Sequence, residues 1–486
     1  MNFVLPEIDL AAIAPQLWLT ATAILVLMVQ VFFPRVGSRF LGLLGILGAL
    51  ASLVATLGLW GQQAVLFSGM IVLDAFSLFF NVVFLLGAIL TILISIEYLE
   101  REQIAQGEYF ALVLFATVGM MIMASGDDLI AIFVGLEILS LSLYVLAGFM
   151  RQVLRSNESS MKYFLLGAFA TGFFLYGIAL LYGTTGSTNL NRIFSMVAQR
   201  GGLDDILVLG GMGLLLVGFG FKVASVPFHM WAPDVYEGAP TPITAFMSTA
   251  AKAGAFAPFV RIFLHSLAGL SASWSPLLAG MAVLSMIVGT LLALVQRQNI
   301  KRLLAYSSIV HVGYLLLGLL SGGAEGGASI LFYLLAYTFM QVGAFAVVIY
   351  LGNRGEEDLS LAHFSGVAVR HPVAALAFSV FLLSLAGIPP TAGFVGKFYI
   401  FSAAVRTGHV GLAIVGVLTS VVSLYYYLGV IVYMYMRDPI ELPARRPSVA
   451  LVLALALAAV GTVEMGLFPG NFLDLAQQSV ARLLGS

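Results

Sequence analysis

The sequence predicts an all-α polytopic membrane protein with about 14 transmembrane helices. Three observations support this prediction. Of the 486 residues, 61% are hydrophobic and only 9% are charged, whereas soluble domains carry about 25% charged residues. The mean hydropathy is +1.04, and long apolar runs recur from one end of the chain to the other. We therefore expect one membrane domain over residues 1–486, with no separate water-soluble domain.

Each predicted span is a run of about 20 apolar residues, the length that crosses the hydrocarbon core of a bilayer. In chain order the candidate spans are 16–33, 40–60, 71–96, 109–124, 129–149, 161–183, 206–236, 242–265, 274–296, 302–320, 328–352, 373–404, 410–436 and 448–468. Charged residues such as Arg35, Arg101 and Arg437 separate most of them. No basic region precedes the first run, so we expect a retained span rather than a cleaved signal peptide.

Arginine and lysine are distributed unequally between the two sides of the predicted bundle. The connections after odd-numbered spans hold 13 of them: Arg35, Arg39, Arg101, Arg151, Arg155, Arg297, Lys301, Arg302, Arg354, Arg370, Arg437, Arg445 and Arg446. The opposite side holds five, counting one at its rim: Arg192, Arg200, Arg261, Arg406 and Arg482. Because positive residues collect on the cytoplasmic side, we expect both termini outside the cytoplasm.

Two of the candidate spans, 206–236 and 373–404, are longer than a membrane requires. Each has more than 30 residues, or about 45 Å as a helix, against a hydrocarbon core of about 30 Å. Both contain helix breakers, which are Pro227 in the first and the Gly-Ile-Pro-Pro run at 387–390 in the second. We interpret both as discontinuous helices, and two ordinary proline kinks are the alternative.

The two broken spans are the seventh and the twelfth, so if they are equivalent they run in opposite directions. This arrangement is typical of inverted repeats built around discontinuous helices. The sequence therefore predicts two inverted five-helix repeats. The first covers spans 4–8, residues 109–265, and the second covers spans 9–13, residues 274–436.

The lysines of this chain are few and lie in costly places. There are only five, and Lys301 alone is expected in a short basic connection, beside Arg297 and Arg302. A lysine at bilayer depth costs about 2.5–3.5 kcal/mol on insertion scales. Unlike arginine, lysine can lose its proton when it is buried. Lysines kept inside apolar segments therefore indicate titratable groups that move charge, most simply protons.

Five ionisable residues within the spans are candidates for a proton relay: Glu137, Lys222, Lys252, His311 and Lys397. A buried carboxylate needs a cation, so we expect an ion-pair partner for Glu137. Burial favours the neutral form of a lysine and a nearby carboxylate favours the charged form, so one moving neighbour can hold or release a proton. The alternatives are snorkelling of the lysines to the interface and a packing role for the histidine. Lys162, close to Glu158, is either a relay residue or a rim residue.

Composition and failed motifs exclude several functions. The chain has no cysteine, so it holds no disulfide, iron–sulfur cluster or cysteine-attached haem, and any electron transfer must occur in another polypeptide. The net charge of −1 suggests no nucleic-acid partner, and no metal site is predicted. Residues 393–398 resemble a phosphate-binding loop only faintly, because the first glycine and the final Ser/Thr are missing. The acids Asp127, Asp128 and 356–358 are expected to be solvated loop residues.

Three motifs resemble those of one family. Residues 227–242 read Pro-Phe-His-Met-Trp-Ala-Pro-Asp-Val-Tyr-Glu-Gly-Ala-Pro-Thr-Pro, residues 301–309 read Lys-Arg-Leu-Leu-Ala-Tyr-Ser-Ser-Ile, and residues 385–394 read Leu-Ala-Gly-Ile-Pro-Pro-Thr-Ala-Gly-Phe. On these motifs the chain resembles the antiporter-like membrane subunits of complex I over nearly its whole length. The Val-Tyr-Glu-Gly form of the first motif is similar to that of the N-type branch of bacterial NADH-quinone oxidoreductases.

The resemblance implies a role for each candidate residue. Glu137 would be the carboxylate partner of Lys222, Lys252 the central lysine, Lys397 the terminal lysine on the exit side, and His311 a bridge between the halves. It also implies proton translocation in the bacterial inner membrane, driven by redox chemistry elsewhere. NADH, FMN, iron–sulfur clusters and quinone would bind to partner subunits and no cofactor to this chain.

The implied partners are the other subunits of complex I, including neighbouring antiporter-like membrane subunits, together with the lipid bilayer. The main alternative is a subunit of a multisubunit sodium/proton antiporter, which would share the fold and the lysines. A purely structural membrane scaffold is the third class of function. It is disfavoured because ionisable groups at lipid depth are costly to keep.

Overall fold

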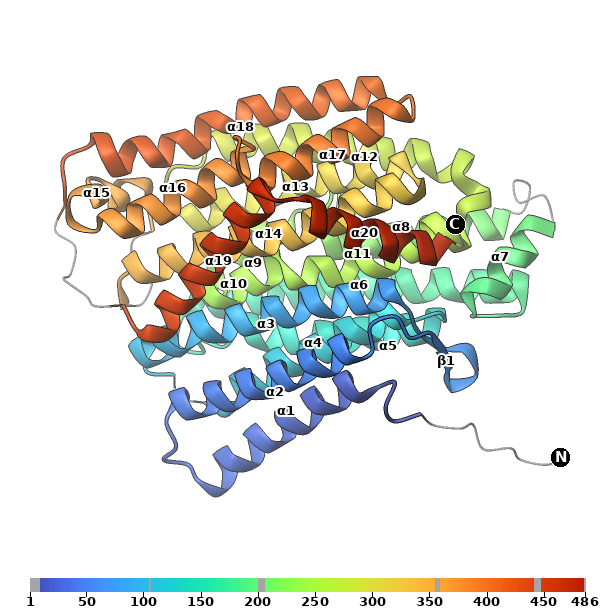
Figure 1. Ribbon diagram of the computed structural model, residues 1–486, viewed down its shortest axis with the longest axis horizontal. Coiled ribbons are helices and arrows are strands. Elements are labelled where there is room, and N and C mark those ends of the chain that lie inside the picture. Colours follow the sequence, from blue (N-terminus) through green and yellow to red (C-terminus); the bar gives the residue numbers. More distant parts are fainter. Residues whose placement is uncertain (1–8, 105, 200–205, 355–358, 441–446, 485–486) are drawn as a thin grey trace.

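Nearly all of the long apolar segments form α-helices in the computed structural model, which describes residues 9–104, 106–199, 206–354, 359–440 and 447–484 (Figure 1). Three arginines that contribute to the predicted orientation lie outside the described residues, namely Arg200, Arg445 and Arg446. The acids at 356–358 also lie outside them.

The helices are antiparallel for most of the chain and follow the predicted spans closely. They are α1 (Ala14–Phe32), α2 (Ser38–Gly58), α3 (Ala75–Glu102), α4 (Gly107–Ser125), α5 (Leu129–Ala147), α6 (Leu154–Thr185), α7 (Leu190–Gln199), α8 (Ile206–Val223), α9 (Trp231–Gly238), α10 (Thr241–Ser248), α11 (Ala250–Arg261), α12 (Ser271–Leu294), α13 (Ile300–Ser321), α14 (Gly323–Leu351), α15 (Val367–Arg370), α16 (Pro372–Ala386), α17 (Ala392–Arg406), α18 (Val410–Met436), α19 (Val449–Leu467) and α20 (Gly470–Leu484). Thirteen helical stretches of the described chain are long and apolar enough to cross a membrane. With α16 and α17 as two halves of a further crossing, the prediction of about 14 spans is confirmed.

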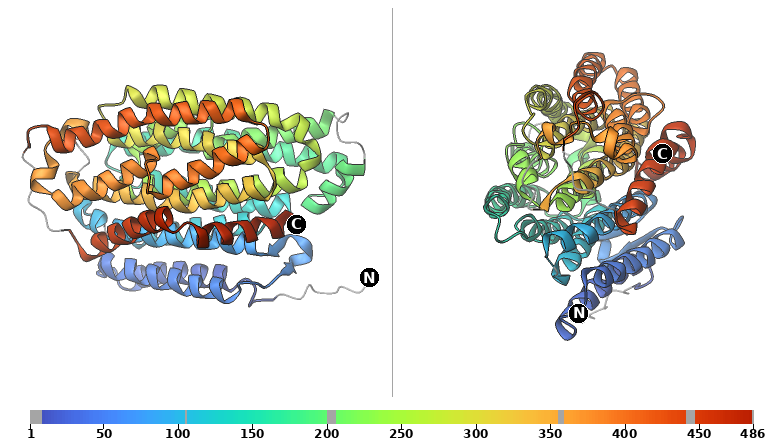
Figure 2. Two further views of the ribbon diagram at one scale, coloured as in Figure 1. Left: turned by 45° about the horizontal axis from the view of Figure 1, so that its top comes forward. Right: turned by 90° about the vertical axis from the view of Figure 1, so that its left-hand side faces the viewer.

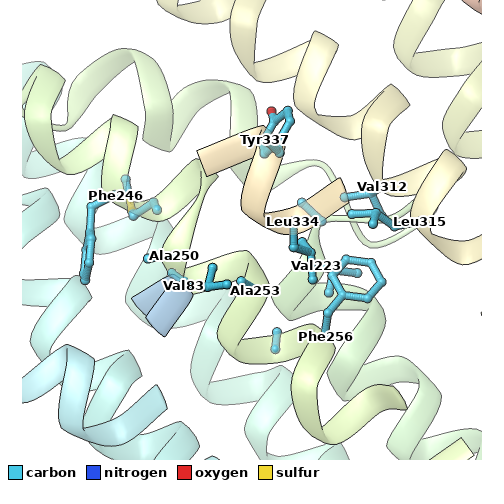
Figure 3. Close-up of a cluster of buried hydrophobic side chains, with 14 of the residues drawn as sticks. Val83, Val223, Phe246, Ala250, Ala253, Phe256, Val312, Leu315, Leu334 and Tyr337 are labelled. Atoms are coloured by element: carbon cyan, nitrogen blue, oxygen red, sulfur yellow. The ribbon is translucent and has the colours of Figure 1, made fainter. Parts of the chain in front are cut away.

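The centre of the bundle is formed by α3, α10, α11, α13 and α14, whose apolar segments are almost wholly buried. Figure 3 shows part of this core, where Val83, Ala250 and Leu334 come together from α3, α11 and α14. The outer helices α1, α6, α18 and α19 expose large apolar side chains instead. In Figure 2 the end-on view shows these outer helices around the central ones. An apolar outer surface is what helices in contact with lipid require.

Both predicted discontinuities are present. α8 ends at Val223, and Ala224 follows with φ of 60°, a left-handed conformation that an α-helix does not continue. Helical structure resumes only at α9, after Pro227. α16 ends before Gly387, whose φ of 87° terminates the helix, and α17 begins after Pro390. The prediction of discontinuous helices is therefore confirmed.

A third interruption was not predicted. The span expected to be continuous over 242–265 divides into α10 and α11 at Thr249, whose φ and ψ are −116° and −89°. No glycine or proline marks this point. The hydroxyls of Ser248 and Thr249 both donate to the carbonyl oxygen of Ala245, at 2.9 and 2.7 Å, and so compete with the backbone hydrogen bonds of the helix.

Two predictions about charged connections are wrong. Lys301 belongs to the first turn of α13, which is capped by the Asn299 side chain; it is fully buried and donates to the carbonyl oxygen of Ala239 at 2.6 Å. Asp127 and Asp128 are also buried, at 5% and 6% exposure. Asp128 caps the N-terminus of α5, and burial raises the pKa of the Asp127 carboxyl, with Arg261 opposing that rise. These residues lie at the start of α5 and α13, and both helix starts are inside the bundle rather than in solvated loops.

Three smaller elements were missed because none contains a long apolar run. They are the hairpin of β1 (Ala64–Leu66) and β2 (Ile71–Leu73), in which Ala64 pairs with Leu73, and the amphipathic helices α7 and α20. α20 buries Leu473, Ala476 and Val480 and exposes Asp474, Gln477 and Gln478. Figure 1 shows β1, α7 and the C-terminal end of α20 toward the right-hand end of the bundle.

Candidate functional site

Lys222 lies next to the last residue of α8, at the start of the first break. Its side chain is 6% exposed, and its Nζ donates hydrogen bonds to Ser140 Oγ at 2.7 Å and to the Tyr163 hydroxyl at 3.3 Å. The rings of Tyr144 and Tyr163 face the ammonium at 5.8 and 5.3 Å, which adds cation–π attraction. Lys222 is therefore held inside the protein and does not snorkel to an interface.

Glu137 lies on α5, three residues before Ser140, and is half-buried. The expected ion pair is not formed, because no salt bridge to Lys222 occurs among the described residues. Its Oε1 is buried without a hydrogen-bond partner in the same part of the chain. Residues three apart share one face of a helix, so the carboxylate lies beside the hydroxyl that binds Lys222. Glu137 is thus a carboxylate near Lys222 that makes no direct bond to it.

A charged cluster of four side chains, Lys162, Asp234, Glu237 and Arg302, joins α6, α9 and α13. Asp234 accepts from Lys162 at 2.6 Å and from Arg302 at 2.8 Å, and Arg302 also binds Glu237 at 2.7 Å. Both cations therefore hydrogen-bond the Asp234 carboxylate. The Lys162 side chain is 40% exposed, so the rim interpretation of this lysine is the correct one.

Trp231 connects this charged cluster to Lys222. Its ring stacks on Tyr163 with 4.5 Å between centroids and 10° between planes. Its Nε1 donates to the carbonyl oxygen of Phe221 at 2.9 Å, one residue before Lys222. The indole therefore closes over the Lys222 site from the side of α9.

Lys252 is the third residue of α11, directly after the interruption at Thr249. It is 3% exposed, and its Nζ donates to Ser308 Oγ at 2.8 Å and to the Ser308 carbonyl oxygen at 3.2 Å. The Tyr236 ring lies 5.9 Å from the ammonium. Ser308 belongs to α13, so Lys252 connects two of the most deeply buried helices.

His311 lies one turn beyond Ser308 on α13 and is 2% exposed. Its two ring nitrogens hydrogen-bond to tyrosine hydroxyls, Nδ1 to Tyr333 at 2.5 Å and Nε2 to Tyr427 at 3.0 Å. Tyr427 also hydrogen-bonds Ser307. The imidazole therefore takes part in a buried network of exchangeable protons.

Lys397 lies on α17, just beyond the second break, and is 4% exposed. Its Nζ donates to the carbonyl oxygens of Leu385 and Ala386 and to Ser420 Oγ, each at 2.9 Å. The two carbonyls are free because α16 ends at Gly387, and the C-terminus of a helix attracts a cation. Lys397 also lines a largely apolar cleft of about 800 Å³ between α16, α17 and α18, whereas the cavity beside Lys222 measures about 10 Å³.

The five predicted residues are thus buried or half-buried, and none is hydrogen-bonded directly to another among the described residues. Every hydrogen bond that Lys222, Lys252 and Lys397 donate goes to a hydroxyl or a carbonyl oxygen. Sequence reasoning missed these hydrogen-bond partners: Ser140, Tyr163, Ser308, Tyr333, Ser420 and Tyr427. Of these six residues, only Ser308 lies within one of the three sequence motifs. Three residues of the charged cluster also lie within these motifs: Asp234, Glu237 and Arg302. The sequence did not mark these tyrosines as functional, because tyrosine is common at the ends of membrane helices, where it lies at the membrane–water interface.

Discontinuous helices that carry buried ionisable groups define a class of membrane transport protein. Residues 126–423 match the family described as NADH:quinone oxidoreductase/Mrp antiporter, transmembrane part, and the chain belongs to this family.

Similar proteins include NADH-quinone oxidoreductase subunit N of Trichlorobacter lovleyi, 50% identical over 97% of each chain. The subunit N of Chloroflexus aggregans is 46% identical over 100% of each. Among solved structures, a chain of respiratory complex I from Thermus thermophilus is 37% identical, with a TM-score of 0.81 over 95% of this chain and 99% of that one. A chain of the Mrp complex from Dietzia gives a TM-score of 0.87 over 98% of each, but at 23% identity it shows the fold alone.

Proposed function

We propose that this chain translocates protons as the N-type membrane subunit of a bacterial NADH:quinone oxidoreductase. The observation that carries the proposal is the series of buried ionisable side chains, Lys222, Lys252, His311 and Lys397, each bound to hydroxyls or carbonyls. The names of the most similar relatives support the same function. The N-type interpretation of the first motif agrees with those names.

The chemistry of the series suits proton transfer. A buried lysine can exist as ammonium or as neutral amine, and a hydroxyl can donate to an amine or accept from an ammonium. Ser140 and Ser308 therefore satisfy Lys222 and Lys252 in either protonation state. No step leaves a lysine nitrogen without a hydrogen-bond partner, which keeps the cost of each intermediate low.

Glu137 controls the first step. A nearby carboxylate favours the charged form of a lysine. Because Glu137 makes no direct bond to Lys222, a displacement of α5 or of the glutamate side chain changes this attraction without breaking a hydrogen bond. The proton released from Lys222 passes through Lys252 and His311 toward Lys397, the terminal lysine of the relay.

The arrangement of the relay is that of two inverted repeats, residues 109–265 and 274–436, with both termini on the non-cytoplasmic side of the inner membrane. Two observations support it. Lys222 and Lys397 flank breaks five spans apart, and basic residues are concentrated in the connections after odd-numbered spans. A reporter active only in the cytoplasm, fused to either terminus, is expected to stay silent; activity at both termini would contradict this orientation.

The redox chemistry takes place in partner subunits, which bind NADH, FMN, iron–sulfur clusters and quinone. The absence of cysteine supports this division of labour, because protein-bound clusters are held mainly by cysteine thiolates. The chain contributes a translocase activity and no catalytic redox site.

The test is purification of the complete assembly from its native membrane. Co-purification with flavin- and cluster-containing polypeptides, and acidification of sealed vesicles on addition of NADH and quinone, are expected. Isolation with antiporter subunits only, and sodium-dependent proton exchange without electron transfer, would instead establish the sodium/proton antiporter alternative.

A further inference from the structure

The imidazole of His311 lies between two tyrosine hydroxyls that come from two other helices. Tyr333 is on α14 and Tyr427 on α18, and their hydroxyls are 2.5 and 3.0 Å from Nδ1 and Nε2. Both tyrosines are fully buried. Each ring nitrogen therefore faces a group that can donate one proton and accept another.

On one side the hydrogen bonds reach Ser307, which neighbours the Lys252 site in the chain, and on the other side the packing reaches the neighbour of Lys397. Tyr427 also binds Ser307, the residue before Ser308, which holds Lys252. The Tyr333 ring packs so closely on Gly396 that a side chain at 396 would collide with it, and Gly396 precedes Lys397. We call the series Ser307, Tyr427, His311 and Tyr333 the His311 row.

We propose that Tyr427 and Tyr333 are proton-carrying residues, and that through His311 they link the surroundings of Lys252 to those of Lys397. The inference rests on the proposed function, because it assigns the middle part of the same relay.

One proton crosses the His311 row without leaving a charge on any member. The Ser307 hydroxyl gives its proton to the Tyr427 oxygen, the Tyr427 proton joins Nε2, and the Nδ1 proton joins the Tyr333 oxygen. The original Tyr333 proton leaves toward the neutral amine of Lys397, and Ser307 is reprotonated from the side of Lys252. Every group ends with as many protons as it had, and rotation of the hydroxyls and of the imidazole ring restores the starting arrangement of donors and acceptors.

The variants Tyr427→Phe and Tyr333→Phe test the link, since each keeps the ring and removes only the hydroxyl. In the complete complex, reconstituted in sealed vesicles, electron flow, acidification and the solvent deuterium isotope effect are measured together. A positioned proton-transfer group typically contributes about 100-fold or more. We expect acidification to slow by at least about tenfold and the isotope effect to rise, because proton transfer becomes rate-limiting.

The control is Tyr109→Phe, which removes a buried tyrosine hydroxyl bound to Ser95 at 2.9 Å, between α3 and α4 and away from the His311 row. We expect it to pump like the parent. Parental pumping and isotope effects in both test variants would overturn the proposal. A loss that only follows the amount of assembled complex, with no rise in the isotope effect, would overturn it as well, because that result describes a structural role.

Lys222→Ala in the same series separates this inference from the proposed function. Normal pumping in Lys222→Ala would contradict both the proposed function and the tyrosine link. Loss of pumping in Lys222→Ala, combined with parental behaviour of Tyr427→Phe and Tyr333→Phe, would contradict only the tyrosine link.

Discussion

Lys222 and Lys397 occupy corresponding places beside the two discontinuous helices, yet their ammonium groups are held by different chemistry. Side-chain hydroxyls and aromatic rings surround Lys222, with Glu137 as a nearby charge. Two backbone carbonyls and Ser420 hold Lys397, whose ammonium also faces the Tyr314 ring at 5.2 Å. Carbonyls at a helix end are fixed, whereas a glutamate side chain can move. We therefore propose that Lys222 responds to a signal and that Lys397 provides a stable terminal position.

The strongest test is removal of either lysine. Lys222→Ala and Lys397→Ala are each expected to abolish most of the acidification, because each removes a titratable group from the relay. Assembly is expected to survive better than activity, since the substitution also removes the cost of burying a cation. Where electron transfer is tightly coupled, quinone reduction falls too. Acidification and electron flow in sealed vesicles are the measurements, and full pumping without one lysine removes that lysine from the relay.

The next test is neutralisation of the carboxylate. Glu137→Gln keeps the size of the side chain and removes the charge that favours protonated Lys222. We expect pumping to fall about tenfold, which corresponds to a loss of about 1.4 kcal/mol in that interaction. The matched control is Glu325→Gln, which neutralises an exposed glutamate paired with Arg406 and is expected to cost little. Equal losses would mean that the Glu137 charge has no particular effect on Lys222.

A finer comparison uses the two serines that bind the lysines. Ser140→Ala and Ser420→Ala each remove one hydrogen bond to a charged group, worth about 1.5–3 kcal/mol. Lys397 retains both carbonyls, while Lys222 retains only the longer bond to Tyr163, so Ser140→Ala is expected to be the more damaging. Initial rates of acidification in matched preparations measure the difference. A larger effect of Ser420→Ala would contradict it.

The smallest effect is expected outside the relay. Arg354 is exposed and donates to Gln103 in a connection. Arg354→Ala is expected to leave pumping unchanged and to alter stability by less than about 0.5 kcal/mol, as exposed substitutions usually do. A pumping defect comparable with that of Glu137→Gln would show that charge in general, rather than charge at the lysines, governs the activity.

Sequence reasoning identified those parts of the fold that depend on composition along the chain. The length of the apolar runs predicted the spans. Pro227 and Gly387 predicted the two breaks, because proline and glycine interrupt a helix by their own covalent structure. Buried lysines were found as well, since charge in an apolar run has no inexpensive alternative. The helices α7 and α20 escaped, because they bury one face only and contain no long apolar run.

Features that depend on contacts between helices were not predictable in this way. The contact of Ser140 with Lys222 depends on how α5 and α8 are placed in space, so a direct ion pair with Glu137 was expected where a hydroxyl contact exists. The tyrosines around His311 come from α14 and α18, far away in the chain. Lys301 was expected in a loop, but it lies in the first turn of α13, which Asn299 caps. A single capping residue is only a weak sequence signal for the start of a helix.

The three interruptions near the lysines differ in permanence. A proline lacks the N–H group that a continuous helix needs, so the covalent structure of the chain itself prevents a continuous helix at Pro227 and Pro390. Ser248 and Thr249 keep their N–H groups, so the covalent structure does not forbid a continuous helix at this point. The break in the segment that carries Lys252 is therefore the one of the three that a change of backbone conformation alone can close.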